Sequence, residues 1–504
     1  MLFTLAFRHL LVRKRRALFL LLGFALGVGV MMVLLSVGEA MVEQSRDVSL
    51  VGGGEVTVLP QGIDVEALRT GGIGGMFFGI ERARFVTRQL VGGPRERGAV
   101  AVVAPAIANK LLYLAREGDV GPAVPVRAAG EVPSRARAVG AGLRVAAGRW
   151  TDTPADSAWV APTAQQLYDQ LDRFHLPPGA DSTWGEWHYF NVVSAPDEWW
   201  YLTFLVGGAV GRGRWGGQLL ATHRRPDGRY ERFVAAIPAT AITLDTTRAD
   251  LTLGPDSVRQ RDGAYHVVAR VPAAAGGTGG TGGTGALRVD LVVRPLPHRY
   301  FPPVELSEDV FLSGYVVPGL AADATGTLCV GARCVRVEGA PAYHDHNWGT
   351  WRGVTWEWGA ARGAAFSLLY GGVYGPEGVT ATTAAPFFVA LVDSLGLRQV
   401  LRFRTIGYEG TRAAQGATDV AAPARFTLVA ARESDTVRLA VTVDDALATR
   451  TAAAGFDRAF VQMRGRFTLD GRLAGAAVHD TGSGFFETYV RPQSPSRTRT
   501  PAVR

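Results

Sequence analysis

From about residue 156 onward, the chain consists of short runs of aromatic and β-branched residues separated by Gly, Pro and Asp-Gly. Examples are WWYLTFLVGG, LRVDLVVRP, FSLLYGGVYG and VRLAVTVDD. Successive side chains of a strand point to opposite faces, so short alternating runs with turn signals are typical of antiparallel barrels or sandwiches. We therefore expect a mainly β fold over most of the chain.

A second feature concerns the N-terminus. The run from Ala17 to Val37 is uncharged, mostly apolar and long enough to cross a bilayer as a helix. Basic residues 13–16 precede it, and Glu39 and Glu43 follow. The positive-inside rule then predicts a single-pass anchor in the bacterial inner membrane, with the bulk of the chain outside the cytoplasm. A cleaved signal peptide is the alternative, but no A-x-A-like cleavage site follows the run.

The charge balance does not indicate a nucleic-acid partner. The chain has 53 Lys and Arg against 45 Asp and Glu, a net charge of +8. The acids are scattered among the arginines, and no basic stripe interleaved with aromatic residues or nucleic-acid motif is present. We expect no nucleic-acid binding.

The two cysteines, Cys329 and Cys334, lie in two short strand-like runs around Gly331. In an oxidising compartment they can form a cross-strand disulfide, and two free buried thiols are the alternative. No second Cys or His pair at matching spacing indicates a zinc site there.

Residues 1–155 resemble the N-terminal part of MacB-type ABC transporter permeases. The stretches that carry the likeness are LAFRHLLVRKRRALFLLLGFALGVGV, GGGEVTVLPQGIDVEAL and LRVAAGRWTDTPADSAWVA. The chain departs from such permeases because it has no later membrane helix and no phosphate-binding G-x-x-x-x-G-K-[ST] loop. The resemblance implies an anchor over 1–46, a small extracytoplasmic α/β domain over 47–155, and transporter components as partners.

Three further stretches together resemble the carotenoid 1,2-hydratase (hydroxyneurosporene synthase) family and its AttH-like relatives. They are TWGEWHYFNVV with DEWWYLTFLVGG, then AYHDHNWGTWRGVTWEWG, then GSGFFETYV. The resemblance implies two lipocalin-like antiparallel β-barrel halves, over 156–300 and 301–490, and an elongated apolar ligand. The polar tail, 491–504, is expected to be disordered.

The stretch around Asp345 can be interpreted from its residues. Alternation along a strand places Tyr343, Asp345 and Asn347 on one face, and His344, His346 and Trp348 on the other. Hydration of an isolated alkene needs a proton donor, and a carboxylic acid buried beside rings stays protonated at neutral pH. Asp345 fits the acid, Tyr343 or Asn347 fits an orienting group, and tryptophan rings can stabilise a carbocation. The ring candidates are Trp348, Trp356 and Trp358.

Two other interpretations stay open. A buried Asp among His, Asn and Trp donors can simply hold a barrel together. His344 and His346, with Glu357 close in sequence, are potential metal ligands, but nothing fixes the position of a third and fourth ligand such as His188. We therefore expect no metal and no cofactor. His344, His346 and Glu357 are instead ligand-binding candidates. The remaining ligand-binding candidates, for which a core position is the alternative, are His188, Trp199, Trp200 and Tyr201.

The sequence thus leaves two functional hypotheses. The first is a cofactor-free hydro-lyase, or a related cyclase or isomerase, that acts on an isoprenoid or carotenoid-like substrate with Asp345 as general acid. The second is a non-catalytic lipid-binding or carrier protein that accompanies a MacB-type transporter. A raised pKa of Asp345 favours the first, and a pKa depressed by several donors favours a structural role.

Overall fold

The chain divides into two compact units. A computed structural model describes residues 14–45, 56, 58, 80–96, 98–114, 124–139, 151–156, 159, 172–175, 184–272, 285–308, 311–350, 353–374, 387–417, 419–450 and 458–490. One unit comprises 1–83 and 100–160, and the other comprises 84–99 and 161–504. The predicted disordered tail, 491–504, lies outside the described residues.

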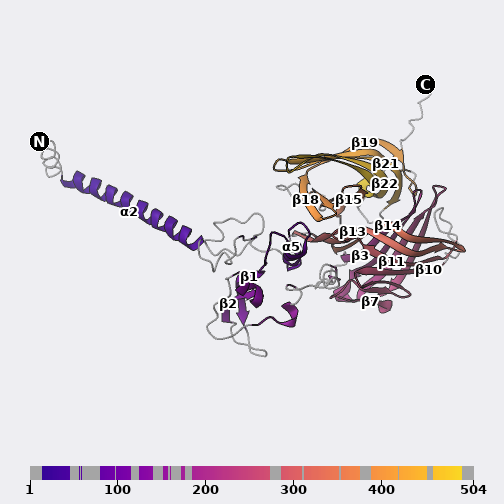
Figure 1. The fold of residues 1–504 in the computed structure, drawn as a ribbon, viewed down its shortest axis with the longest axis horizontal. Helices are drawn as coiled ribbons and strands as arrows, with labels where there is room; N and C mark the ends of the chain where they lie inside the picture. The colour runs from indigo at the N-terminus through magenta and orange to yellow at the C-terminus, as the bar shows by residue number, and fades with distance from the viewer. Residues whose placement is uncertain are drawn as a thin grey trace, which may run out of the picture. The chain divides into compact units, whose positions relative to one another are not determined.

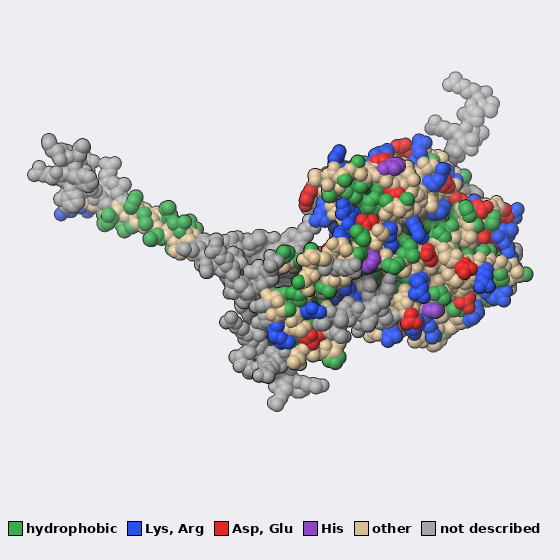
Figure 2. Space-filling view, viewed as in Figure 1, with side chains coloured by type: hydrophobic (Ala, Val, Ile, Leu, Met, Phe, Trp, Pro, Cys, Tyr) green, Lys and Arg blue, Asp and Glu red, His purple; other side chains and the backbone are tan. Residues whose placement is uncertain are grey.

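The first unit contains a long helix and a small α/β portion. Helix α2 (Lys14–Ser45) includes the predicted anchor run, and its described apolar side chains, such as Phe19 and Leu26, are exposed (Figure 2). Taken over the described residues alone, no helix meets the length and apolarity that a membrane crossing requires. The other elements are the antiparallel hairpin of β1 (Ala106–Leu114) and β2 (Val124–Glu131), helix α6 (Pro133–Ala138) and the 3-10 turn η1 (Pro154–Asp156).

The first sheet of the second unit is 12-stranded and antiparallel (Figure 1). Its order is β6-β5-β4-β3-β14-β13-β11-β10-β9-β8-β7, and β12 pairs with β13. Turns η2 (Val210–Arg212) and η3 (Ala239–Ala241) connect some of its strands. The strands are β3 (Trp184–Ala195), β4 (Glu198–Ala209), β5 (Arg214–Arg224), β6 (Tyr230–Pro238), β7 (Ile242–Leu244), β8 (Leu251–Leu253), β9 (Asp256–Arg261), β10 (Ala264–Val271), β11 (Leu287–Pro295), β12 (Phe301–Glu308), β13 (Phe311–Val330) and β14 (Arg333–Thr350).

The second sheet is 9-stranded, in the order β18-β17-β16-β15-β23-β22-β21-β20-β19. The pairing of Arg402 with Ala431 joins β18 to β20, so the strand order returns on itself as in a barrel. The strands are β15 (Thr355–Gly363), β16 (Ser367–Tyr374), β17 (Phe387–Asp393), β18 (Gly396–Phe403), β19 (Ile406–Ala413), β20 (Ala421–Arg432), β21 (Asp435–Arg450), β22 (Ala459–Leu473) and β23 (Ala476–Val490).

The prediction of a mainly β fold with two barrel-like antiparallel halves is confirmed. The change from the first sheet to the second falls between Thr350 and Thr355, later than the boundary expected between residues 300 and 301. The reason is the pairing of β14, which bonds to β13 on one side and to β3 on the other. The chain therefore comes back, through the long strands β13 and β14, to pair with β3, the first strand of this sheet in the sequence.

A disulfide, a helix contact and an ion pair add to the strand pairing of the β unit. Cys329 and Cys334 lie opposite each other at the turn between β13 and β14 and form a disulfide. Helix α5 (Ile80–Gly92) packs on the β unit through the ring of Phe85, which meets that of Tyr300 edge-on at 5.7 Å. After this helix, the Arg95 guanidinium contacts both carboxylate oxygens of Asp393 at 2.7 Å.

Buried side chains form three main clusters in the β unit. One fills the first sheet and includes Phe190 and Tyr265, and another fills the second sheet and includes Phe426. The third draws on both sheets, because Tyr343 of β14 and Trp358 of β15 belong to it. We call this third group the intersheet cluster. Its buried members are Tyr189, Trp199, Tyr201, Tyr230, Phe301, Tyr315, Val317, Leu320, Tyr343, Trp358, Ala360, Leu369, Phe388, Ala390, Val392 and Leu447.

Candidate functional site

Strand β14 carries functional candidates on both of its faces. Tyr343, Asp345 and Asn347 share one face, and hydrogen bonds join their side chains to one another. His344 and His346 point the other way, into the first sheet, where both are fully buried. The strand alternation thus separates an acid at the intersheet cluster from a histidine group inside the first sheet.

Asp345 is buried and held through both of its oxygens. The Tyr343 hydroxyl donates to Oδ2 at 2.7 Å, and the Asn347 amide donates to Oδ1 at 2.6 Å. The Trp358 indole N–H donates in turn to the Tyr343 hydroxyl oxygen at 2.9 Å. Only 3% of Asp345 is exposed. These bonds fix the direction of the carboxyl group without adding a cation beside it.

The environment of Asp345 favours its neutral form. Burial raises the pKa of Asp345 to about 8; the hydrogen bond from Tyr343 opposes this rise, and the negative charge of Glu487 adds to it. The desolvation of a carboxylate therefore outweighs the donors that would stabilise its charge. At neutral pH, Asp345 is a protonated acid.

Aromatic rings from both sheets belong to the cluster of Tyr343, which donates to this acid. Trp358 belongs to the same cluster, and its ring meets that of Tyr315 edge-on at 4.9 Å. Gly371 lies opposite Trp358 in the sheet, and a Cβ added there would come within 2.4 Å of the indole. A side chain at residue 371 would therefore displace the Trp358 ring. The glycine allows Trp358 to lie flat against β16.

One edge of the cluster is partly open to solvent. Trp187, Asn347 and Trp356 are each of intermediate exposure. Trp187 is the register partner of Asn347, and its ring lies 6.3 Å from that of Trp356. The side of Asp345 nearest solvent is therefore the side of Asn347, which donates to it.

Glu487 is a second acid beside the cluster, half-buried, that the sequence reasoning did not select. It is the register partner of Trp358 on β23. The Trp356 indole N–H donates to it at 2.9 Å, and the Gln462 amide donates at 3.4 Å. Burial raises the pKa of Glu487. Its apolar neighbours in GSGFFETYV were the available signal, since a lone acid in such a strand stands out.

Some predicted ligand-binding residues lie apart from Asp345. Glu357 contacts other strands of its own sheet, where Tyr408 and Thr488 donate to it at 2.5 and 2.9 Å. Burial raises the pKa of Glu357 to about 7. Trp200 belongs to the first sheet's core and stacks on His223 at 3.6 Å. In contrast, Trp199, Tyr201, Trp356 and Trp358 all belong to, or pack against, the intersheet cluster.

A cavity of about 240 Å³ lies elsewhere in the first sheet. Trp200, His223, Glu231 and Arg333 are among its lining residues, and none of the predicted catalytic residues lines it. Its charged lining does not suit an apolar ligand. The intersheet cluster offers the aromatic surface that an apolar ligand favours, and the neutral form of Asp345 lies beside it.

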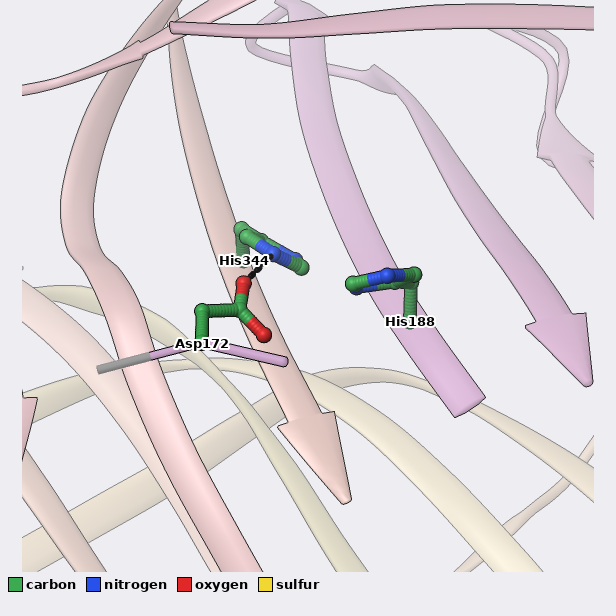
Figure 3. Close-up of side chains that lie close together, drawn as sticks. All are labelled: Asp172, His188 and His344. Carbon is green, nitrogen blue, oxygen red and sulfur yellow. Dashed lines mark ion pairs between the residues drawn. The ribbon is translucent and has the colours of Figure 1, made fainter. Parts of the chain in front are cut away.

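The opposite face of β14 forms a buried polar group with β3. His346 Nδ1 lies 2.5 Å from Asp172 Oδ1, and its Nε2 lies 3.1 Å from Glu186 Oε1. Burial lowers the pKa of His346, but the charges of Asp172 and Glu186 and the hydrogen bonds to both together outweigh burial and raise the pKa to about 9. His344 and His188 complete the group (Figure 3), and burial lowers the pKa of each.

Asp172 could not be found from the sequence. It lies in the short described segment 172–175, outside any strand. The same segment supplies His175, whose ring stacks on Trp348 at 3.7 Å. Trp348 thus contacts the histidine group and not the acid Asp345.

Comparisons with known proteins add little to this geometry. No protein-family model and no curated protein matches the chain. Among solved structures, a putative AttH from Nitrosomonas europaea is 15% identical with a TM-score of 0.42, covering 63% of this chain and 96% of its own. Kievitone hydratase from Nectria haematococca is 12% identical with a TM-score of 0.39, covering 63% and 95%.

A third solved structure, CghA with Sch210972, is 14% identical with a TM-score of 0.42 and covers 64% of this chain and 94% of its own. TM-scores this low carry no argument about fold or activity, both of which rest here on the chain's own residues. None of the comparisons supports the permease likeness of residues 1–155.

Proposed function

We propose that the β unit binds an apolar, isoprenoid-like ligand at the intersheet cluster and adds water to it, or closes a ring, with Asp345 as the general acid. The observation that carries this proposal is the burial of Asp345 beside Tyr343 of the aromatic cluster, which raises its pKa to about 8 and favours its neutral form. A neutral carboxylic acid beside apolar surface is the group that alkene protonation requires.

The reaction follows from the positions of these groups. Asp345 transfers its proton to one carbon of the double bond, and a tertiary cation forms at the other carbon. The rings of Trp358 and Tyr315 belong to the same cluster as Tyr343, and the electron-rich faces of such rings stabilise cations. Water then adds to the cation and returns a proton to the Asp345 carboxylate, which restores the acid.

Tyr343 and Asn347 act as orienting groups in this proposal. Their donors contact opposite oxygens of Asp345, so the carboxyl plane cannot rotate freely. Trp358 restrains Tyr343 in the same way through its indole N–H. Such fixed orientation lowers the reorganisation needed at the moment of proton transfer.

The second candidate is a non-catalytic carrier of a hydrophobic ligand beside a transporter. The observation that favours it is the 3% exposure of Asp345, together with donors on both of its oxygens. In this alternative, Asp345 holds β14 in place against the second sheet and performs no chemistry.

We also propose that residues before the β unit anchor the chain in a membrane. The exposed apolar side chains of α2, which include Leu22, Phe24 and Leu34, support this proposal. An anchor at the membrane would place the β unit close to the source of a lipid-like ligand.

The test begins with the ligand that the full-length protein carries. Lipids extracted from protein purified in detergent are identified by mass spectrometry. The recovered isoprenoid is then incubated with fresh protein in ¹⁸O-labelled water. We expect a labelled alcohol, or a cyclised isomer of equal mass, in amounts that depend on protein concentration.

The controls separate the candidates. Asp290→Asn alters an exposed acid of β11 and should leave product formation unchanged. A bound isoprenoid that stays unchanged would favour the carrier. Phospholipid alone, with no product from added acyclic carotenoid, would contradict the enzymatic proposal.

A further inference from the structure

Three side chains that the proposed reaction does not use converge inside the first sheet. Asp172, His188 and His344 are each fully buried, and one ligand atom of each lies within 4.8 Å of the others. Figure 3 shows His188 and His344 on neighbouring strands, with Asp172 beside them from a separate segment. The surroundings are aromatic, because Phe190 stacks on His344 at 4.1 Å and Phe174 lies edge-on to His188 at 5.3 Å.

Backbone carbonyls fix the tautomer of both imidazoles. His188 Nε2 lies 2.9 Å from the carbonyl oxygen of Ala249, and His344 Nδ1 lies 3.0 Å from that of Tyr189. A carbonyl oxygen only accepts hydrogen bonds, so these two nitrogens carry the hydrogens. The other ring nitrogens, His188 Nδ1 and His344 Nε2, then present lone pairs.

Those two lone pairs face the interior of the cluster without a donor. Among the described residues, neither His188 Nδ1 nor His344 Nε2 has a hydrogen-bond partner. His344 Nε2 lies 3.5 Å from Asp172 Oδ2, so a lone pair faces a carboxylate oxygen. Buried acceptors without donors are costly, and the lone pair of His344 Nε2 also repels the carboxylate oxygen that it faces. A cation at their centre removes both costs.

The third ligand is oriented as metal-binding carboxylates usually are. The Tyr265 hydroxyl donates to Asp172 Oδ2 at 2.5 Å, and His346 contacts Oδ1 at the same distance. Ligating histidines that donate their second nitrogen to a carbonyl, and carboxylates held by further hydrogen bonds, are the pattern of a supported metal site.

We propose that Asp172, His188 and His344 bind a divalent first-row metal ion, with zinc as the best fit. Two imidazole nitrogens and one carboxylate oxygen are a zinc ligand set, which water completes to a tetrahedron. The ion would tie the segment at Asp172 to strands β3 and β14. This differs from the sequence-based expectation of no metal. The site lies across β14 from Asp345, so it does not depend on the proposed reaction.

The test measures metal in the purified full-length protein after zinc supplementation and dialysis. We expect about one zinc per chain by mass spectrometry of the metal. Replacement by cobalt should produce the visible absorption bands of a four-coordinate site. Removal with a strong chelator should lower the Tm, and zinc should restore it.

Variants locate the ion. His188→Gln and His344→Gln should each lose it, whereas His223→Gln should retain it. His223 is the matched control because it is equally buried but has carboxylate partners at 3.0 Å on both nitrogens, Glu198 and Glu231. Folded wild-type protein that holds no zinc, or ligand variants that hold as much as the control, would overturn the proposal. If a ligand variant does not fold, the wild-type stoichiometry and chelation measurements decide.

Discussion

Asp345→Asn is predicted to remove a pH-dependent part of the free energy of unfolding. Burial raises the pKa of Asp345 to about 8, well above that of an aspartate in an unfolded chain. The folded protein therefore holds a proton over a pH range in which the unfolded chain has released it. This contribution is fully present below the pKa of the unfolded aspartate and is lost as the pH rises through about 8.

The size of the effect follows from one proton. A difference of one bound proton changes the free energy of unfolding by about 1.4 kcal/mol for each pH unit. Asparagine stays neutral at every pH, so the variant lacks this loss. The difference in free energy of unfolding, wild type minus variant, should then fall by up to about 1.4 kcal/mol for each pH unit across neutral pH. Glu357 and Glu487, whose pKa values burial also raises, are present in both proteins.

The assay is urea unfolding of both proteins, followed by tryptophan fluorescence, at several values between about pH 5 and about pH 8. Asp290→Asn serves as the control, because this exposed carboxylate should give a curve parallel to wild type. Parallel curves for wild type and Asp345→Asn would refute the claim that Asp345 is protonated in the folded protein.

Three further predictions concern the same cluster and the anchor. Tyr343→Phe removes a donor to Asp345 and the acceptor of Trp358; it should lower the free energy of unfolding by about 1–3 kcal/mol, and an unchanged urea midpoint would count against the network. Trp358→Phe keeps a ring face, so turnover should fall less than in Asp345→Asn, and an equal collapse would show that the indole N–H matters more than the ring. A reporter active only in the cytoplasm, fused after Arg504, should be silent; a strong signal would reject the predicted topology.

Sequence alternation was sufficient to separate the two faces of β14. Because side chains alternate between the two faces of a strand, Tyr343, Asp345 and Asn347 were predicted to share one face. In the structure, hydrogen bonds join these three side chains. The burial that decides the protonation state of Asp345 comes from the second sheet, where Trp358 meets Tyr343. Strand patterns do not specify which sheets pack together, so the pKa could not be predicted.

The residues that sequence reasoning missed come from distant segments. Asp172 has no strand pattern around it, yet it meets His346, 174 residues further along the chain. Glu487 approaches Trp358 only through the pairing of β15 with β23. Likewise, the boundary between the sheets depends on β14 returning to β3, a non-local pairing that the spacing of turns does not encode.

The most direct test of the central claim is turnover by Asp345→Asn, measured per folded, ligand-loaded molecule. The substitution preserves size and most of the hydrogen bonding but removes the transferable proton. We predict that formation of the labelled product falls by roughly a hundredfold or more, while ligand binding and the folded fraction change little. A folded, ligand-binding Asp345→Asn protein with full turnover would contradict the assignment of Asp345 as the general acid.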